Sequence, residues 1–237
     1  MVRCAPMTPV LFQDESFLVC VKSPGLLSGA ERSPAPGSPS QSLPAALEQD
    51  LGRAVYPVHR LDRAAGGLMV WGKNRRAAAE LSGAMQRGNF LKEYLCIVRG
   101  RPREDAGTYR DLLLHDQLRN KSFVVERMRR GVREASLSYR VLGEREGLSL
   151  LRIQLHTGRT HQIRVQLASR KTPLAGDRKY GGGAGEMALW SFRLAFPHPD
   201  TGEPLSFLAL PDGAAWEPFR QELAALTADP AASSPQG

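Results

Sequence analysis

Short apolar segments bounded by turn-forming residues recur along the whole chain. Runs of this kind that are rich in β-branched and aromatic residues are typical of strands. The strands predicted from this pattern occupy 10–12, 17–21, 55–58, 68–71, 94–98, 123–125, 137–142, 148–155, 187–196 and 205–210. The first two flank an acidic turn at Asp14 and Glu15, and from 107 to 155 one predicted strand follows another.

Helical periodicity is less frequent. An apolar residue at every third or fourth position predicts helices over 43–51, 75–87, 161–168 and 216–226. Ser42, Asn74 and Thr160 are side chains of the type that caps a helix start, and Gly52 and Gly88 are expected to end helices. Because strands outnumber helices and rarely alternate with them, we expect an α+β fold with a mostly antiparallel sheet rather than a doubly wound one.

The composition is that of a folded protein with a polyanionic partner. A chain of 237 residues with 42% hydrophobic and 24% charged residues can form one large domain or two lobes. The net charge of +8 favours nucleic acid over a membrane surface. We expect a domain over 9–226, a flexible loop rich in Ser, Pro and Gly at 31–41, an N-terminal tail at 1–8 and a disordered tail at 227–237.

Basic residues form two groups. The first consists of Arg127, Arg129, Arg130 and Arg133, and the second of Arg159, Arg164, Arg170, Lys171, Arg178 and Lys179. The second group overlaps a polar segment at 157–164, so we interpret it as a surface that contacts phosphates. The first group fits a solvated surface as well as it fits a binding surface, and the sequence leaves that choice open.

The three cysteines indicate neither a disulfide framework nor a structural zinc site. Cys4, Cys20 and Cys96 show no C-x-x-C spacing. His156 and His161 lie five residues apart without further metal ligands nearby, so hydrogen-bonded structural histidines are the favoured interpretation. We find no secretory signal or transmembrane segment, and the cytoplasm is the expected compartment.

A carboxylate in a predicted loop is the strongest candidate for chemistry. Asp62 follows the segment at 55–58 and precedes a glycine pair, which places it at a strand end, where catalytic groups are often held. Arg60 could pair with Asp62 or reach a phosphate, and Arg164 offers a second cation on a predicted helix. An arginine beside a carboxylate keeps it ionised, as a nucleophile requires. The competing interpretations are a turn-forming Asp and a surface ion pair.

Four segments in order resemble the signatures of the RluA/RsuA-like pseudouridine synthases. They are H-R-L-D at 59–62 with G-L at 67–68, the segment L-K-E-Y-L-C-I-V-R-G at 91–100, T-G-R-T-H-Q-I-R-V-Q-L-A at 157–168, and P-L-A-G-D-R-K-Y-G at 173–181. The resemblance covers roughly residues 9–210. It implies the pseudouridine synthase fold, with helices flanking a mixed sheet around a central catalytic cleft, and an isomerase that acts on structured RNA, ribosomal or transfer.

The resemblance implies a role for each matching residue. Asp62 would be the catalytic carboxylate at the ribose–uracil junction, where attack on the sugar and abstraction of a sugar proton both stay open. Arg60 would help to extrude the target nucleotide and fill the vacated stack. Tyr94 would pack on the uracil and take part in the final proton removal, and Arg164 would pair with Asp62.

The same resemblance implies how RNA is bound. Residues expected to contact the RNA are His59, Arg60, Lys92, Arg159, His161 and Gln162. Isomerisation consumes nothing and transfers no electrons, so no cofactor or metal is expected. A base in a helix must be flipped out at a cost of a few kcal/mol. With eight residues before Pro9, we expect the branch without an S4 domain, acting as a monomer.

Some positions depart from the family pattern. Ala65 and Gly66 stand where Thr and Ser are usual, so two hydroxyls that could brace the catalytic loop are missing. Gln166 replaces a His, and Ser23 replaces a Pro. These departures motivate the alternative of a catalytically impaired RNA-binding paralogue. A hydrolase with an aspartate nucleophile is a weaker alternative, because no second carboxylate motif lies near Asp62 to activate water.

Overall fold

The computed structural model describes residues 8–29 and 42–228 of the chain. The predicted loop at 31–41 and most of the two predicted tails lie outside these residues. The chain divides into two compact units: unit 1 comprises residues 1–90 and 193–209, and unit 2 comprises 91–192 and 210–237. The elements in order are β1 (Val10–Gln13), β2 (Phe17–Lys22), α1 (Leu43–Leu51), β3 (Tyr56–Pro57), β4 (Gly66–Gly72), α2 (Arg75–Gln86), β5 (Leu91–Arg99), β6 (Ala106–Asp116), β7 (Lys121–Val125), β8 (Val132–Arg145), β9 (Leu148–Leu155), α3 (Gln162–Ala168), η1 (Arg178–Tyr180), β10 (Leu189–Pro197), β11 (Pro204–Leu208), η2 (Glu217–Phe219) and α4 (Arg220–Ala228).

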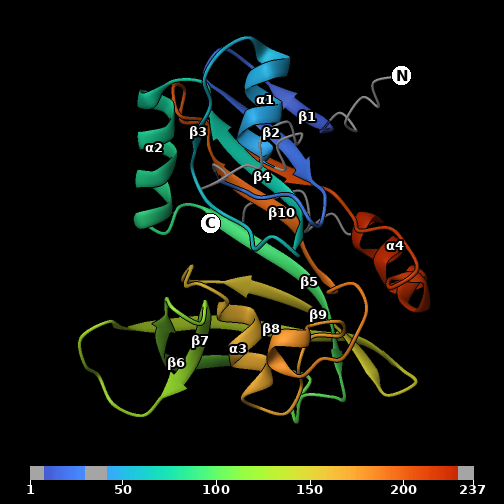
Figure 1. The fold of residues 1–237 in the computed structure, drawn as a ribbon. Coiled ribbons are helices and arrows are strands. Elements are labelled where there is room, and N and C mark those ends of the chain that lie inside the picture. Colours follow the sequence, from blue (N-terminus) through green and yellow to red (C-terminus); the bar gives the residue numbers. More distant parts are fainter. Residues whose placement is uncertain (1–7, 30–41, 229–237) are drawn as a thin grey trace, which may run out of the picture. The chain divides into compact units, whose positions relative to one another are not determined.

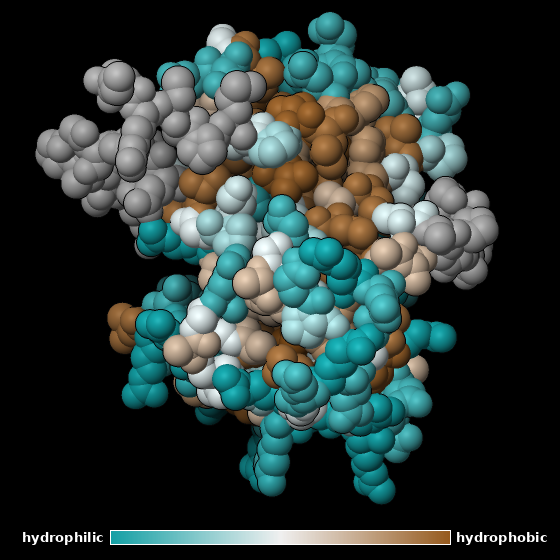
Figure 2. Space-filling model, turned by 90° about the vertical axis from the view of Figure 1, so that its right-hand side faces the viewer, coloured by the Kyte–Doolittle hydropathy of each residue, from teal (hydrophilic) through white to brown (hydrophobic). Residues whose placement is uncertain are grey.

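Unit 1 is built on strands in the order β1-β2-β4-β10 (Figure 1). The pairs β1 with β2, β2 with β4, β3 with β4 and β11 with β10 are antiparallel. Every residue of β4 is buried, which explains its continuous apolar sequence. Phe17, Val70, Leu81 and Phe196 belong to the hydrophobic cluster between these strands and α2. On the face shown in Figure 2, hydrophobic side chains gather over this unit.

Helix α2 begins where the sequence predicts it. The side chain of Asn74 accepts a hydrogen bond from the amide of Ala77 (2.8 Å), which satisfies a donor of the first turn. Close packing of α2 on β4 needs a glycine at position 72, because a Cβ there would lie 2.7 Å from the Cβ of Ala78. The end of β4 and the start of α2 are therefore fixed against each other.

Unit 2 contains an antiparallel sheet in the order β5-β9-β8-β6-β7, with α3 in contact with β6 and β7 (Figure 1). Tyr94 of β5 is paired with Ile153 of β9. A bulge between Val141 and Gly143 interrupts the register of β8 with β9. Strand pairing of this kind confirms the predicted α+β class with a mostly antiparallel sheet.

The prediction for the start of α3 is wrong. Thr160 was expected to cap it, but the N-cap is His161 in a left-handed conformation (φ 56°), with no side-chain cap bond. Tertiary hydrogen bonds impose this entry, because the side chain of Gln162 bonds to Ser136 and the ring of His161 to Tyr180. The other predicted helices occur, although the last one begins with a turn of 3₁₀ helix at Glu217–Phe219.

Cys20 and Cys96 are buried free thiols. Burial raises the pKa of both thiols, that of Cys20 to about 12. Within the described ranges, no group of three or more His, Cys, Asp or Glu side chains could hold a metal ion. None of the helices in those ranges is long and apolar enough to cross a membrane.

Candidate active site

The loop that carries Asp62 is fixed by hydrogen bonds to the segment after β2. Buried Ser28 donates through Oγ to the carbonyl oxygen of Leu61 (2.6 Å) and accepts from the amide of Leu61 (3.2 Å). The amide of Ala65 donates to the carbonyl oxygen of Asp62 (3.1 Å), which closes a turn. These bonds support the loop even though the hydroxyls expected at Ala65 and Gly66 are absent.

Lys22 is a second brace of this loop, and the sequence did not single it out. Its side chain is fully buried, and Nζ donates to the carbonyl oxygens of Ser23 (3.0 Å), Leu26 (2.9 Å) and Arg63 (3.1 Å). Burial lowers the pKa of Lys22 to about 8, while the charge of Asp62 raises it. Lys22 therefore places a buried positive charge near the candidate carboxylate.

Arg63 and Gly25 complete this contact. The amide of Gly25 donates to the carbonyl oxygen of Arg63 (2.8 Å), and Nε of Arg63 donates to the carbonyl oxygen of Gly25 (2.9 Å). Gly25 has a φ of 93°, a conformation that glycine adopts readily. The segment 22–28 thus holds the backbone of Leu61 and Arg63 on either side of Asp62.

His59 and Arg60 have different surroundings. Nε2 of His59 accepts from the amide of Val70 in β4 (3.2 Å), and its ring lies edge-on to Phe90. A bond of this kind anchors the histidine to the core of unit 1. Arg60, by contrast, is exposed.

In unit 2, the segment that precedes α3 is tied to β8 through Gln162. The buried side chain of Gln162 accepts at Oε1 from Oγ1 of Thr157 (2.7 Å) and from the amide of Arg159 (3.0 Å). Its Nε2 donates to the carbonyl oxygen of Ser136 (3.0 Å). Gln162, expected to bind RNA, thus shapes the loop of the exposed Arg159, whose Nε donates to the carbonyl oxygen of Glu134 (2.9 Å).

Arg164 of α3 forms a buried two-point ion pair with Asp177. Nε of Arg164 lies 2.7 Å from Oδ2 and Nη2 lies 2.9 Å from Oδ1. The guanidinium carbon lies 5.1 Å from the centre of the Tyr180 ring. The sequence prediction missed Asp177 and Tyr180 as site residues, although both lie in the fourth segment that resembles the family.

Tyr180 also connects α3 to β7. Its hydroxyl accepts from the amide of Ser122 (2.7 Å) and lies 3.0 Å from Nδ1 of His161. Burial raises the pKa of Tyr180, so the phenol stays protonated at neutral pH. His161 and His156 are hydrogen-bonded, as predicted, with Nε2 of His156 2.8 Å from Oγ of Ser138.

Strand β5 contributes two further predicted residues, both buried. Tyr94 is 5% exposed and Lys92 is 7% exposed. Burial lowers the pKa of Lys92, and the charge of Arg159 lowers it further. Between them, Glu93 makes a two-point ion pair with Arg152 (2.8 and 2.9 Å). The structure thus brings Lys92 and Arg159 together within unit 2.

Gln166 replaces the usual histidine and holds α3 to β6. It is fully buried, and Nε2 donates to Oδ2 of Asp111 (2.7 Å). Arg170 pairs with the same carboxylate through both of its terminal nitrogens (2.9 and 3.1 Å). The departure at this position therefore affects the attachment of the helix that carries Arg164.

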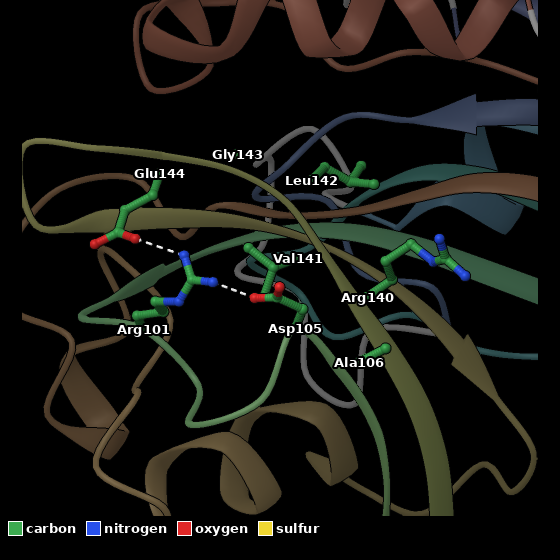
Figure 3. Close-up of a pocket in the computed structure, with 8 residues that line it drawn as sticks. All are labelled: Arg101, Asp105, Ala106, Arg140, Val141, Leu142, Gly143 and Glu144. Atoms are coloured by element: carbon green, nitrogen blue, oxygen red, sulfur yellow. Dashed lines mark hydrogen bonds and ion pairs between the residues drawn. The ribbon is translucent and has the colours of Figure 1, made fainter.

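A cavity of about 450 Å³ in unit 2 lies apart from these residues (Figure 3). Arg101 bridges Asp105 and Glu144 there, while Arg140 extends away from them. None of the predicted site residues lines the cavity. Arg101, the cation that lies between the two carboxylates, is already paired with both of them.

Comparison with known proteins shows the family. The model of the RNA pseudouridylate synthase family matches residues 16–169. An uncharacterised RNA pseudouridine synthase of Aquifex aeolicus is 33% identical over 84% of this chain and 67% of its own length. Ribosomal large subunit pseudouridine synthase D of Xanthomonas campestris is 32% identical over 83% of this chain and 63% of its own length. The chain spans about two thirds of the length of these relatives.

Solved structures share the fold. The human RNA pseudouridylate synthase domain containing 4 superposes with a TM-score of 0.70 at 22% identity, covering 92% of this chain and 93% of that one. The human domain containing 1 gives a TM-score of 0.70 at 20% identity, covering 97% of both chains. By sequence and by fold, the chain belongs to the family of RNA pseudouridine synthases, which are isomerases.

Proposed function

We propose that this chain converts specific uridines of ribosomal or transfer RNA to pseudouridine, with Asp62 as the catalytic carboxylate. The observation that carries the proposal is the bracing of the Asp62 loop. Ser28 holds Leu61 and Lys22 holds Arg63, so both neighbours of the carboxylate are fixed to one segment. Preorganisation of this kind is what a reacting group needs to act without a reorganisation cost.

The reaction breaks one bond and forms another at the same sugar carbon. The bond between the sugar C1′ and uracil N1 breaks, the base turns, and C1′ bonds to uracil C5. The hydrogen on C5 leaves as a proton while N1 gains one, so no oxidant or reductant is needed. Asp62 acts at the sugar, either on C1′ or on a sugar proton, and both routes need it ionised.

Residues of unit 2 complete the proposal. Tyr94 packs on the uracil and assists the last proton transfer, and Arg164 is the cation that keeps Asp62 charged. The pairing of Arg164 with Asp62 joins residues of different units and stays a prediction. Asp177 and Tyr180 fix the guanidinium of Arg164 from within its own unit, which supports its role as an oriented cation.

Binding follows from the exposed cations. Arg60, which precedes the braced Leu61, is exposed. We propose that its side chain occupies the stack vacated by the flipped nucleotide. Arg159 and Lys92, with His59, His161 and Gln162, contact the flanking RNA or shape the loops that do. Phosphate contacts make affinity fall with salt. We further propose that the protein acts as a cytoplasmic monomer without a cofactor or metal.

Release of the C5 hydrogen gives a direct test. RNA carrying tritium at uracil C5 should lose label to water with the wild-type protein. Asp62→Asn should release none above background while binding the RNA with unchanged affinity. Asp50→Asn removes an exposed carboxylate of the same unit and should behave as the wild type. Release by Asp62→Asn at the wild-type rate would refute the role of Asp62.

A catalytically impaired RNA-binding paralogue is the second candidate, favoured by the residues at 65 and 66. Ala65 is 1% exposed and offers no hydroxyl. If the wild type binds RNA with the expected salt dependence but releases no tritium from any cellular RNA, this second candidate replaces the first.

A further inference from the structure

The connection between β7 and β8 exposes a cluster of arginines that the catalytic proposal does not use. We call residues 126–131 the arginine loop, because it contains Arg127, Arg129 and Arg130, all exposed. Met128, between them, is 57% exposed. A single exposed apolar side chain is common on protein surfaces, so the three arginines carry the argument.

The loop is held in place by the sheet. β7 and β8 both pair with β6, with Val125 opposite Leu112 and Val132 opposite Leu114, so the loop must cross β6. The amide of Val132 donates to the carbonyl oxygen of Arg129 (3.0 Å), and Gly131 has a φ of 85°. This is a tight turn with glycine at its third position. Arg129 and Arg130 are therefore presented from a fixed turn.

The charge of the loop is not neutralised by ion pairs. In the part of the chain that the structure describes, no carboxylate lies within ion-pair distance of Arg127, Arg129 or Arg130. Several other arginines of unit 2 are paired: Arg101 with Asp105 and Glu144, Arg145 with Glu222, Arg152 with Glu93, and Arg170 with Asp111. The loop thus concentrates available positive charge, and the nearest carboxylates along the chain are Glu126 and Glu134.

Hydrogen bonds join the strand after the loop to the candidate site. Nε of Arg159 donates to the carbonyl oxygen of Glu134. Two residues further, Ser136 donates its amide to Oγ1 of Thr157 (2.9 Å) and accepts from Gln162 (3.0 Å). The first residues of β8 therefore connect the loop to Arg159, whose charge acts on Lys92.

We propose that the arginine loop binds the sugar–phosphate backbone of the RNA at a distance from the target nucleotide. The inference rests on the proposed function, since it assigns the loop to the same RNA. From Glu134 to Gly131 the chain advances by about 10 Å, at about 3.3 Å per strand residue. Because this distance exceeds the rise of about 3.4 Å per nucleotide of a stacked strand, the loop contacts other phosphates than those held by Arg159. The loop thus adds affinity for structured RNA that extends beyond the target.

Salt dependence of binding tests the proposal. The variant carrying Arg127→Gln, Arg129→Gln and Arg130→Gln removes three charges from exposed positions. Each lost phosphate contact lowers the slope of log Kd against log salt by about 0.7 to 0.9, so the slope should fall by about 2 to 3. At 50 mM salt the affinity for a hairpin RNA containing the target should fall at least about tenfold.

Two controls isolate the loop. A variant with Arg103→Gln, Arg140→Gln and Arg220→Gln removes the same charge from exposed positions of unit 2 and should keep the wild-type slope. Replacing the three loop arginines by lysine should keep it as well.

The outcomes separate this inference from the catalytic proposal. An unchanged slope for the loop variant, or an equal loss in the control variant, overturns the inference while tritium release by the wild type upholds catalysis. If the loop variant has a lower slope of log Kd against log salt and the wild type releases no tritium, the RNA-binding role of the loop is supported and the catalytic proposal is refuted. If the loop variant loses binding to vesicles of anionic phospholipid but not to RNA, the surface serves a membrane and the inference is wrong.

Discussion

Replacing Lys22 by methionine removes the buried ammonium that holds the Asp62 loop. Methionine has a similar length and apolar character, so the side-chain volume is largely kept. The change leaves the carbonyl oxygen of Leu26 without the donor it has in the wild type. The carbonyl oxygen of Arg63 keeps its bond from the amide of Gly25.

The free energy of unfolding should change in a way that depends on pH. Three hydrogen bonds from a charged donor contribute about 1.5 to 3 kcal/mol each. Lowering the pKa of Lys22 from 10.5 to about 8 means that keeping it charged at pH 7 costs about 3 kcal/mol. The difference predicts that Lys22→Met destabilises the protein by about 1.5 to 6 kcal/mol at pH 7.

The sign of the pH effect follows from proton binding. Between pH 8 and 10.5 the unfolded chain holds a proton on Lys22 that the folded protein has released, so wild-type stability rises with pH relative to the variant. The gap between the two proteins should widen by about 2 to 3 kcal/mol from pH 7 to pH 10. Other groups titrate equally in both proteins, so their contributions cancel in the difference between the two free energies of unfolding.

Urea unfolding followed by tryptophan fluorescence measures this gap. Trp71 is fully buried in the same unit and reports its unfolding. Wild type and Lys22→Met are compared at pH 7 and pH 10, with the slope of free energy against urea checked for constancy. A gap that stays the same at the two pH values would refute the account of Lys22 as a charged group buried at an energetic cost.

Three further substitutions test the support of the site. Ser28→Ala removes both bonds to Leu61 and should destabilise by about 1 to 3 kcal/mol in urea unfolding, with slower tritium release and little change in RNA affinity. Gln166→Leu should cost about 1 to 3 kcal/mol, because it breaks the bond to Asp111, while the modified uridines in a sequencing map stay the same. Ala65→Thr should lower the melting temperature through overpacking of about 1 to 3 kcal/mol and should not raise the rate of tritium release, since the loop is already braced.

Local features of the fold could be predicted from sequence, because their causes lie within a few residues. The cap at Asn74 bonds to the amide of Ala77, three residues away. The stop after α1 is Gly52 in the left-handed conformation. By contrast, the start of α3 depends on Tyr180 and Ser136, which only the folded chain brings to His161 and Gln162. The prediction of Thr160 as the cap failed for that reason.

The same division applies to the candidate site. Asp62 could be singled out from its place in a loop at a strand end, and the resemblance to a family added the roles of Asp62 and Arg164. Asp177 is 13 residues from Arg164, a spacing from which their ion pair cannot be predicted. In the sequence, Lys22 is the polar residue at the end of a predicted strand. Its burial depends on the fold, which brings the carbonyl oxygen of Arg63 to its ammonium group. Bracing of the loop by distant backbone could therefore not be predicted.

Pseudouridine mapping tests the central claim most directly. RNA from cells that lack this protein is incubated with the wild type or with Asp62→Asn, and pseudouridines are mapped at single-nucleotide resolution. The account predicts at least one site that the wild type adds and Asp62→Asn does not, although the variant binds the RNA. If the wild type adds no such site, or the variant adds it equally, the claim that Asp62 catalyses uridine isomerisation is wrong.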